Sequence, residues 1–110
     1  MAGNSPAVNP YLVQQVKTAS PEKLILMLYE IGMKSCKAQD NRKAVSVLTE
    51  LIAALNFDHN DIAMSFFELY RFALDEVHNH HYDNAYMVFE GMHDMWSNVV
   101  MKHQMEGSQN

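Results

Sequence analysis

Apolar residues recur at intervals of three and four along most of the chain, which is the spacing of one face of an α-helix. The pattern predicts helices over residues 21–38, 42–56, 61–79 and 84–103. The last three helices carry the clearest stripes, which are Ala44, Val45, Leu48, Leu51, Ile52 and Leu55, then Ile62, Phe66, Leu69, Tyr70, Ala73 and Val77, then Ala85, Val88, Phe89, Met92, Met95, Trp96, Val99 and Val100.

Short polar stretches separate these helices, at Asp40-Asn41, 56–60 and 79–81. At the start of the first helix, Ser20 is suited to cap the free backbone N–H groups and Pro21 to occupy the first helical position. Asp61 or Asn60 is expected to cap the third helix, and Asp83 or Asn84 the fourth.

The connections are too short for a long crossover, so neighbouring helices should run antiparallel. The prediction is an all-α protein, an antiparallel four-helix bundle over residues 21–104. Residues 1–20 are expected to form a flexible N-terminal segment that packs on the bundle, and residues 105–110 a disordered tail.

Two of the predicted helices are more apolar than a bundle of this size requires. Six consecutive apolar residues run from Leu24 to Tyr29, and the third helix has further apolar residues outside its stripe, namely Met64, Phe67, Phe72 and Leu74. A helix that is apolar on several sides buries its second face against something else. We therefore expect this surface to be covered by the N-terminal segment, by another subunit or by a partner chain.

Composition narrows the class of protein. The chain has 110 residues, which is enough for one domain, and its net charge of −5 argues against nucleic acid as a partner. The single cysteine, Cys36, excludes an internal disulfide and favours a reducing compartment. No signal peptide is visible, and no apolar run approaches the ~20 residues that a membrane span needs, so a cytoplasmic location is expected.

Candidate chemistry is sparse. His78, His80 and His81 lie beside Asp83, but adjacent residues on a helix point about 100° apart, and a solvated turn is the preferred interpretation over a metal site. No glycine-rich phosphate loop or nucleophile motif is present. The sequence thus predicts a protein that is not an enzyme and has no catalytic residues, metal or cofactor.

One long segment resembles a known family. Residues 11–32 read YLVQQVKTASPEKLILMLYEIG. They resemble the flagellin-specific secretion chaperones, the FliS family, whose members typically carry a Tyr, a Val, Thr-Ala-Ser-Pro and then Leu-Ile-x-Met-Leu-Tyr-Asp/Glu-Gly. Leu69-Tyr70 followed by Phe72 is similar to the Leu-Tyr-x-Tyr of the family's third helix, and Trp96 stands where members usually have a Trp.

The resemblance implies a bacterial cytosolic bundle that binds the disordered C-terminal segment of flagellin, prevents premature filament assembly and keeps flagellin ready for the flagellar export apparatus. It implies a partner surface, for which the candidate residues are Tyr11, Val16, Leu24, Met27, Leu28, Leu69 and Tyr70. The segment through Tyr11 and Val16 is expected either to cover the binding surface until flagellin displaces it or to contact the partner itself.

The sequence also departs from the family, because Asp75-Glu76-Val77 stands where an Arg-Arg-Leu run is usual. Three alternatives stay open at this point. The chain serves a different flagellin, it serves another secreted protein, or its extra apolar surface forms an interface between copies of itself, as in a homodimer or another homo-oligomeric assembly subunit.

Overall fold

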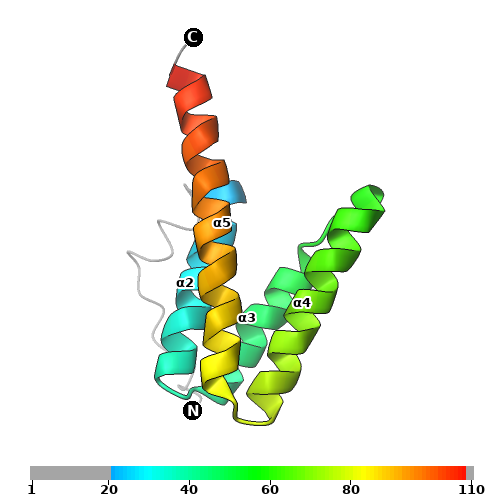
Figure 1. Ribbon diagram of the computed structural model, residues 1–110, viewed down its shortest axis with the longest axis vertical. Helices are drawn as coiled ribbons and strands as arrows, with labels where there is room; N and C mark the ends of the chain where they lie inside the picture. Colours follow the sequence, from blue (N-terminus) through cyan, green and yellow to red (C-terminus); the bar gives the residue numbers. More distant parts are fainter. Residues whose placement is uncertain (1–20, 109–110) are drawn as a thin grey trace, which may run out of the picture.

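A computed structural model describes residues 21–108 and, within this range, the side chains of all residues except 59–60 and 103–108. Its helices are α2 (Pro21–Lys37), α3 (Asn41–Ala53), the 3-10 helix η2 (Phe57–His59), α4 (Asn60–His78) and α5 (Tyr82–Ser108). The described residues contain no strand. The chain is therefore all-α, and the predicted antiparallel four-helix bundle is confirmed (Figure 1).

The four long helices form a ring in which each contacts the helices before and after it. Helix α2 packs against α3 and α5, and α4 packs against the same two helices. Helices α4 and α5 lie close at the turn that joins them and diverge toward the first residues of α4 (Figure 1). This divergence leaves one end of the bundle closed and the other open.

Two tight turns of the same kind bring consecutive helices side by side. After α2, Gln39 adopts a positive φ of 55°, and the Asp40 N–H donates to the Ser35 carbonyl at 2.8 Å. After α4, His80 adopts a φ of 61°, and the His81 N–H donates to the Glu76 carbonyl at 2.8 Å. Both follow the Schellman pattern of helix termination, although neither has the usual glycine.

Each of the next helices begins immediately after its turn. The Asp40 side chain accepts a hydrogen bond from the Lys43 N–H at 3.1 Å, so that Asp40 caps α3. Helix α5 begins at Tyr82, earlier than predicted, so Asp83 lies in its first turn instead of capping it. Helix α4 begins at Asn60, which confirms the predicted start to within one residue.

One face of each long helix contributes side chains to the core. Its largest fully buried side chains are Tyr29, Leu48, Leu51, Val77 and Phe89. Most positions of the predicted stripes are buried or half-buried. The prediction is wrong for Ile62 and Met95, which are 61% and 42% exposed. Ile62 lies in the first turn of α4, at the end that diverges from α5, and is exposed, whereas the next residue, Ala63, is buried.

Two helix ends differ from the prediction. Helix α3 stops at Ala53 instead of continuing to residue 56. The Asn56 side chain accepts a hydrogen bond from the Asp58 N–H at 2.9 Å, a local turn that competes with further helix. Helix α5 continues through Ser108, past the expected bundle boundary at 104. The predicted N-terminal segment, its packing on the bundle and the Ser20 cap lie outside the described residues.

Hydropathy excludes a membrane span for every helix in the described part of the chain. Even the longest, α5, lacks the length of continuous apolar sequence that a bilayer crossing needs.

Candidate functional site

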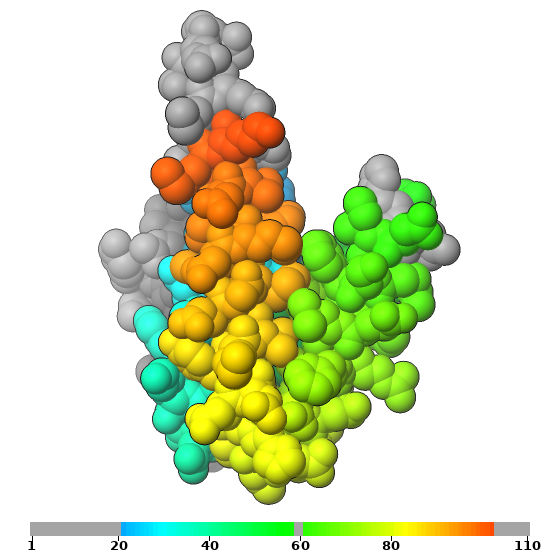
Figure 2. All heavy atoms as spheres, in the orientation of Figure 1, coloured from blue at the N-terminus to red at the C-terminus, as the bar shows by residue number. Residues whose placement is uncertain are grey.

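The best candidate site is an apolar groove along the outside of the bundle, between α4 and α5. We call it the α4–α5 groove, and its volume is about 520 Å³. Its lining residues are Leu69 and Phe72 from α4 with Asn84, Met87, Val88, Gly91 and Met92 from α5. Figure 2 shows the surface between these two helices as a hollow that widens toward the diverging end.

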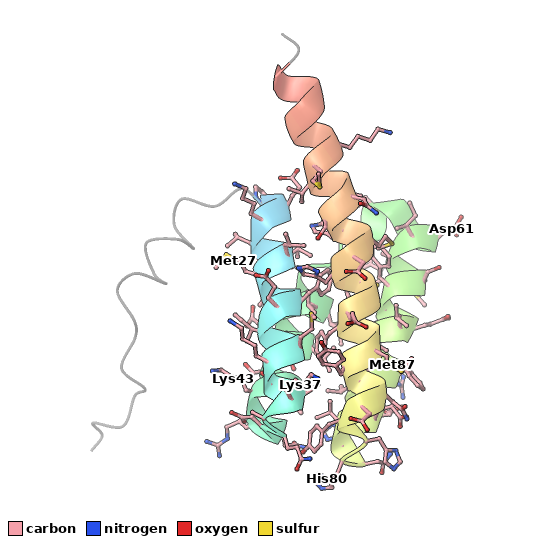
Figure 3. The ribbon with its side chains drawn as sticks, turned by 60° about the vertical axis from the view of Figure 1, so that its left-hand side comes forward. Met27, Lys37, Lys43, Asp61, His80 and Met87 are labelled. Carbon is pink, nitrogen blue, oxygen red and sulfur yellow. The ribbon has the colours of Figure 1, made fainter. Side chains whose placement is uncertain are left out.

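Large apolar side chains of the groove are open to solvent. Phe72 is 50% exposed and Met87 is 67% exposed. In Figure 3, Met87 projects from α5 on the side where α4 lies. Nothing lies within 4 Å of the position that a Cβ of Gly91 would occupy, so the wall of the groove is open there. Exposed apolar side chains gathered around a groove mark a binding surface more often than side chains scattered singly do.

A hydrogen-bonded cluster closes the groove at the turn between its two helices. Asn84 Nδ2 donates to Glu76 Oε1 at 2.7 Å, and His81 Nδ1 lies 3.3 Å from Glu76 Oε2. These contacts favour the carboxylate, first through Asn84 and then through His81, so the pKa of Glu76 is lowered from its ordinary value. The cluster ties α5 to α4 at this end and holds the two walls together.

Acidic side chains flank the apolar ones on both walls. On α4, Phe72 lies four residues after Glu68 and three before Asp75. On α5, Met87 lies four residues after Asp83 and three before Glu90. Residues three and four apart are neighbours on a helix surface, and all four acids are exposed. The groove therefore has an acidic rim on each side.

Basic residues gather on the other half of the bundle. Lys34 and Lys37 of α2 line a separate groove with Tyr86 and His93, and the Lys37 Nζ lies 4.7 Å from the centre of the Tyr86 ring. Figure 3 shows Lys37 and Lys43 on the α2–α3 half, away from Met87. The charge of the bundle is thus divided between its two halves.

A second, smaller cleft lies inside the open end of the bundle, with a volume of about 240 Å³. Its lining comes from all four long helices and includes Ile25, Leu51, Phe66 and Trp96. Trp96 Nε1 donates to the Glu22 carbonyl at 2.8 Å, which ties α5 to the first turn of α2. This contact braces one side of the cleft where α4 diverges.

Two buried tyrosines form the base of that cleft. The hydroxyl oxygens of Tyr29 and Tyr70 lie 2.6 Å apart, and both residues are at most 3% exposed. Burial is the main cause that raises the pKa of each phenol, and for Tyr29 the hydrogen bond to Tyr70 raises it further. Both groups are therefore neutral at physiological pH and serve as structural hydrogen-bonding partners.

The structure places the partner-binding residues predicted from sequence in different parts of the bundle. Leu69 lines the α4–α5 groove, and Tyr70 beside it is buried in the core. Leu24, Met27 and Leu28 are half-buried on α2, a helix that does not form the groove. Figure 3 shows Met27 on the side of α2 away from α5.

Of these five residues, only Leu69 lines the α4–α5 groove. Tyr11 and Val16 lie outside the described residues.

Sequence reasoning did not mark the α5 wall as a binding surface. It assigned Val88 and Met92 to the core stripe and left Met87 outside it. The available signal was that Met87 and Gly91 are four residues apart and so lie on the same side of the helix. Phe72, by contrast, was singled out from sequence as apolar surface beyond the needs of the core, and it is half-exposed.

The histidines and the cysteine offer little chemistry in the described part of the chain. No group of three or more His, Cys, Asp or Glu side chains is arranged there to hold a metal ion. His80 Nδ1 lies 3.1 Å from the Tyr82 hydroxyl at the turn. Cys36 is 3% exposed, and burial raises the pKa of its thiol to about 11. A thiol so buried and so weakly acidic is a poor nucleophile.

Comparison with protein-family models, with curated proteins and with solved structures finds no match for this chain.

Proposed function

We propose that this protein is a flagellar secretion chaperone that binds the disordered C-terminal segment of flagellin and keeps it from polymerising before export. The single observation that carries the proposal is the α4–α5 groove, an apolar hollow beside a helix pair with half-exposed Phe72 and Met87. The resemblance of residues 11–32 to flagellin chaperones supports the choice of partner.

The groove suits a partner segment that is disordered when free and becomes ordered on binding. An amphipathic helix that forms on binding would insert apolar side chains between α4 and α5, as helix-in-groove partners do. The methionines of the groove adapt their shape to different side chains because the thioether chain is unbranched. A segment that orders on binding loses chain entropy, so the affinity has to come from a large apolar contact.

The test is a titration of a labelled flagellin C-terminal peptide with the full chain, followed by fluorescence anisotropy. Phe72→Ala and Met87→Ala should each weaken binding by about tenfold, because truncating an anchoring side chain commonly costs more than 1 kcal/mol. Both residues are well exposed, so the melting temperature should change little.

Matched controls exist on the same protein. Phe57 is 50% exposed, as Phe72 is, and Met101 is 59% exposed, close to the value of Met87. Neither residue lines the α4–α5 groove. Phe57→Ala and Met101→Ala should leave the affinity within about twofold of the parent. Equal losses in all four variants would contradict a role for this groove.

Light scattering addresses the competing interpretation. A monomer that binds the peptide supports the chaperone. A stable dimer or larger assembly that shows no response to the peptide would replace this proposal with a homo-oligomeric structural subunit. A monomer that ignores flagellin and retains another secreted protein would replace flagellin with that protein as the cargo.

A further inference from the structure

The charge around the α4–α5 groove defines its occupant more closely than its apolar lining does. We propose that the α4–α5 groove selects a cationic amphipathic helix, with apolar residues on one face and Lys or Arg on both flanks. This inference rests on the proposed function in taking the same groove as the docking site, and it adds the chemistry of the segment that binds there.

The acidic rim is regular along both walls. On α4, Asp61, Glu68 and Asp75 recur every seven residues, so they lie in one line beside Phe72. All three are exposed. Figure 3 shows Asp61 at the outer edge of α4, near the diverging end.

The α5 wall repeats the pattern. Asp83 and Glu90 are also seven residues apart, and Asp94 follows four residues later. All three are exposed, and they lie on the outer side of Met87 and Gly91. No Lys or Arg occurs between Tyr82 and Met101.

Little positive charge offsets this rim. Arg71 is the only Lys or Arg of α4, and it lies three residues after Glu68 and four before Asp75, so one positive charge stands beside the three acids of this wall. On α5, the ring of His93 lies 3.6 Å from Asp94. A helix lying in the groove would therefore place its flanking side chains between two rows of carboxylates.

Charge complementarity between the groove and its occupant distinguishes three possible occupants, which are a second copy of this chain, a helix with acidic flanks and a helix with basic flanks. A second copy of this chain paired groove against groove would bring its own acidic rim against this one, and like charges across an interface cost binding energy. A helix with acidic flanks meets the same repulsion. Lys and Arg flanks gain attraction on both walls, reach the carboxylates on long flexible side chains and speed association.

The experiment uses the full chain and two synthetic amphipathic peptides of about 18 residues. They share one apolar face and differ only in their flanks, which are Lys and Arg in one and Glu in the other. The basic peptide should bind at least about tenfold more tightly at low salt. Its affinity should fall several-fold between about 50 and about 500 mM salt, as charges on an exposed rim are screened. Equal affinity for the two peptides would overturn the inference.

Protein variants locate the effect. The double variant Glu90→Gln with Asp94→Asn removes two charges from the rim. It should bind the basic peptide about fivefold more weakly than the parent does. The control, Glu50→Gln with Asp58→Asn, removes two charges elsewhere and should change the affinity less than about twofold. If the control pair weakens binding as much as the rim pair, net charge and not the groove is responsible, and the inference fails.

A steric variant tests the place of binding independently of charge. Gly91→Gln puts a long side chain into the open wall and favours helix, so the bundle should stay folded by circular dichroism while both flagellin and basic peptides lose affinity. Gly91→Ala is the control and should bind normally.

The two proposals fail in different ways. If the flagellin peptide binds and flank charge has no effect, the charge selectivity is wrong and the chaperone proposal stands. If the basic peptide binds in the groove and flagellin does not, the selectivity stands and the flagellin assignment is wrong.

Discussion

Tyr29 and Tyr70 are joined by a 2.6 Å hydrogen bond between their hydroxyl oxygens, across the middle of the bundle. They belong to α2 and α4, which stand opposite one another in the ring of helices. The two rings are tilted by 43° with centroids 6.5 Å apart, and Phe66 packs beside Tyr70 at 6.3 Å. This pair therefore links two opposite helices of the ring, and both tyrosines line the cleft at the open end of the bundle.

Removing both hydroxyls of the pair should cost less than the sum of the two single removals. Tyr29→Phe or Tyr70→Phe leaves a buried hydroxyl without its partner, and each should lower the free energy of unfolding by about 1–3 kcal/mol. The double Phe variant has no buried hydroxyl without a partner. Its loss of unfolding free energy should therefore be smaller than the sum of the two single losses. Urea unfolding of all four proteins gives the coupling energy. Strictly additive losses would show that the hydrogen bond contributes nothing.

Gly32 of α2 and Gly91 of α5 should respond oppositely to alanine. A Cβ on Gly32 would overlap the ring of Phe89, which is fully buried, so Gly32→Ala should destabilise the bundle by about 1–3 kcal/mol. Gly91 has open space, and Gly91→Ala should stabilise by about 0.5–1 kcal/mol because alanine favours helix. Thermal unfolding measures both, and a neutral Gly32→Ala would show that Phe89 moves aside without cost.

The thiol of Cys36 should be protected by the fold. Its burial and a pKa raised to about 11 mean that little thiolate is present near pH 8. The rate of reaction with a chromogenic disulfide reagent should be lower in the folded protein than in urea by about a hundredfold or more. Equal rates with and without urea would mean that the packing between α2 and its neighbours opens readily.

Acid should remove the stabilisation that Glu76 provides. Because its pKa is lowered in the folded protein, its contribution is present above the ordinary glutamate range and is lost as the pH falls through the folded-state pKa. Glu76→Gln should therefore melt at a lower temperature than the parent at pH 7. The difference in melting temperature between the two proteins should become smaller in acid. Asn84→Ala removes the main donor and should raise the Glu76 pKa, as carboxyl NMR titration would record. A difference in melting temperature that stays constant with pH would contradict a stabilising role of the ionised Glu76.

The helices and most of their buried faces were predictable from sequence because both depend on residues three and four apart. Val77 and Phe89 are examples of predicted stripe residues that are fully buried. The break at Asp40-Asn41 was also predicted, and the structure adds that the Asp40 side chain caps α3. The premature end of α3 was not predicted, because it depends on the Asn56 side chain turning back to the Asp58 N–H.

Helical periodicity alone accounts for the all-α bundle, its order of helices and the surplus of apolar residues such as Phe72. Tertiary structure decided where that surplus gathers. Ile62 belongs to the same stripe as Val77, yet Ile62, at the diverging end of α4, is exposed and Val77 is buried. The α4–α5 groove exists because two helices hold Phe72 and Met87 side by side, and no spacing along one helix specifies which face of another it will meet.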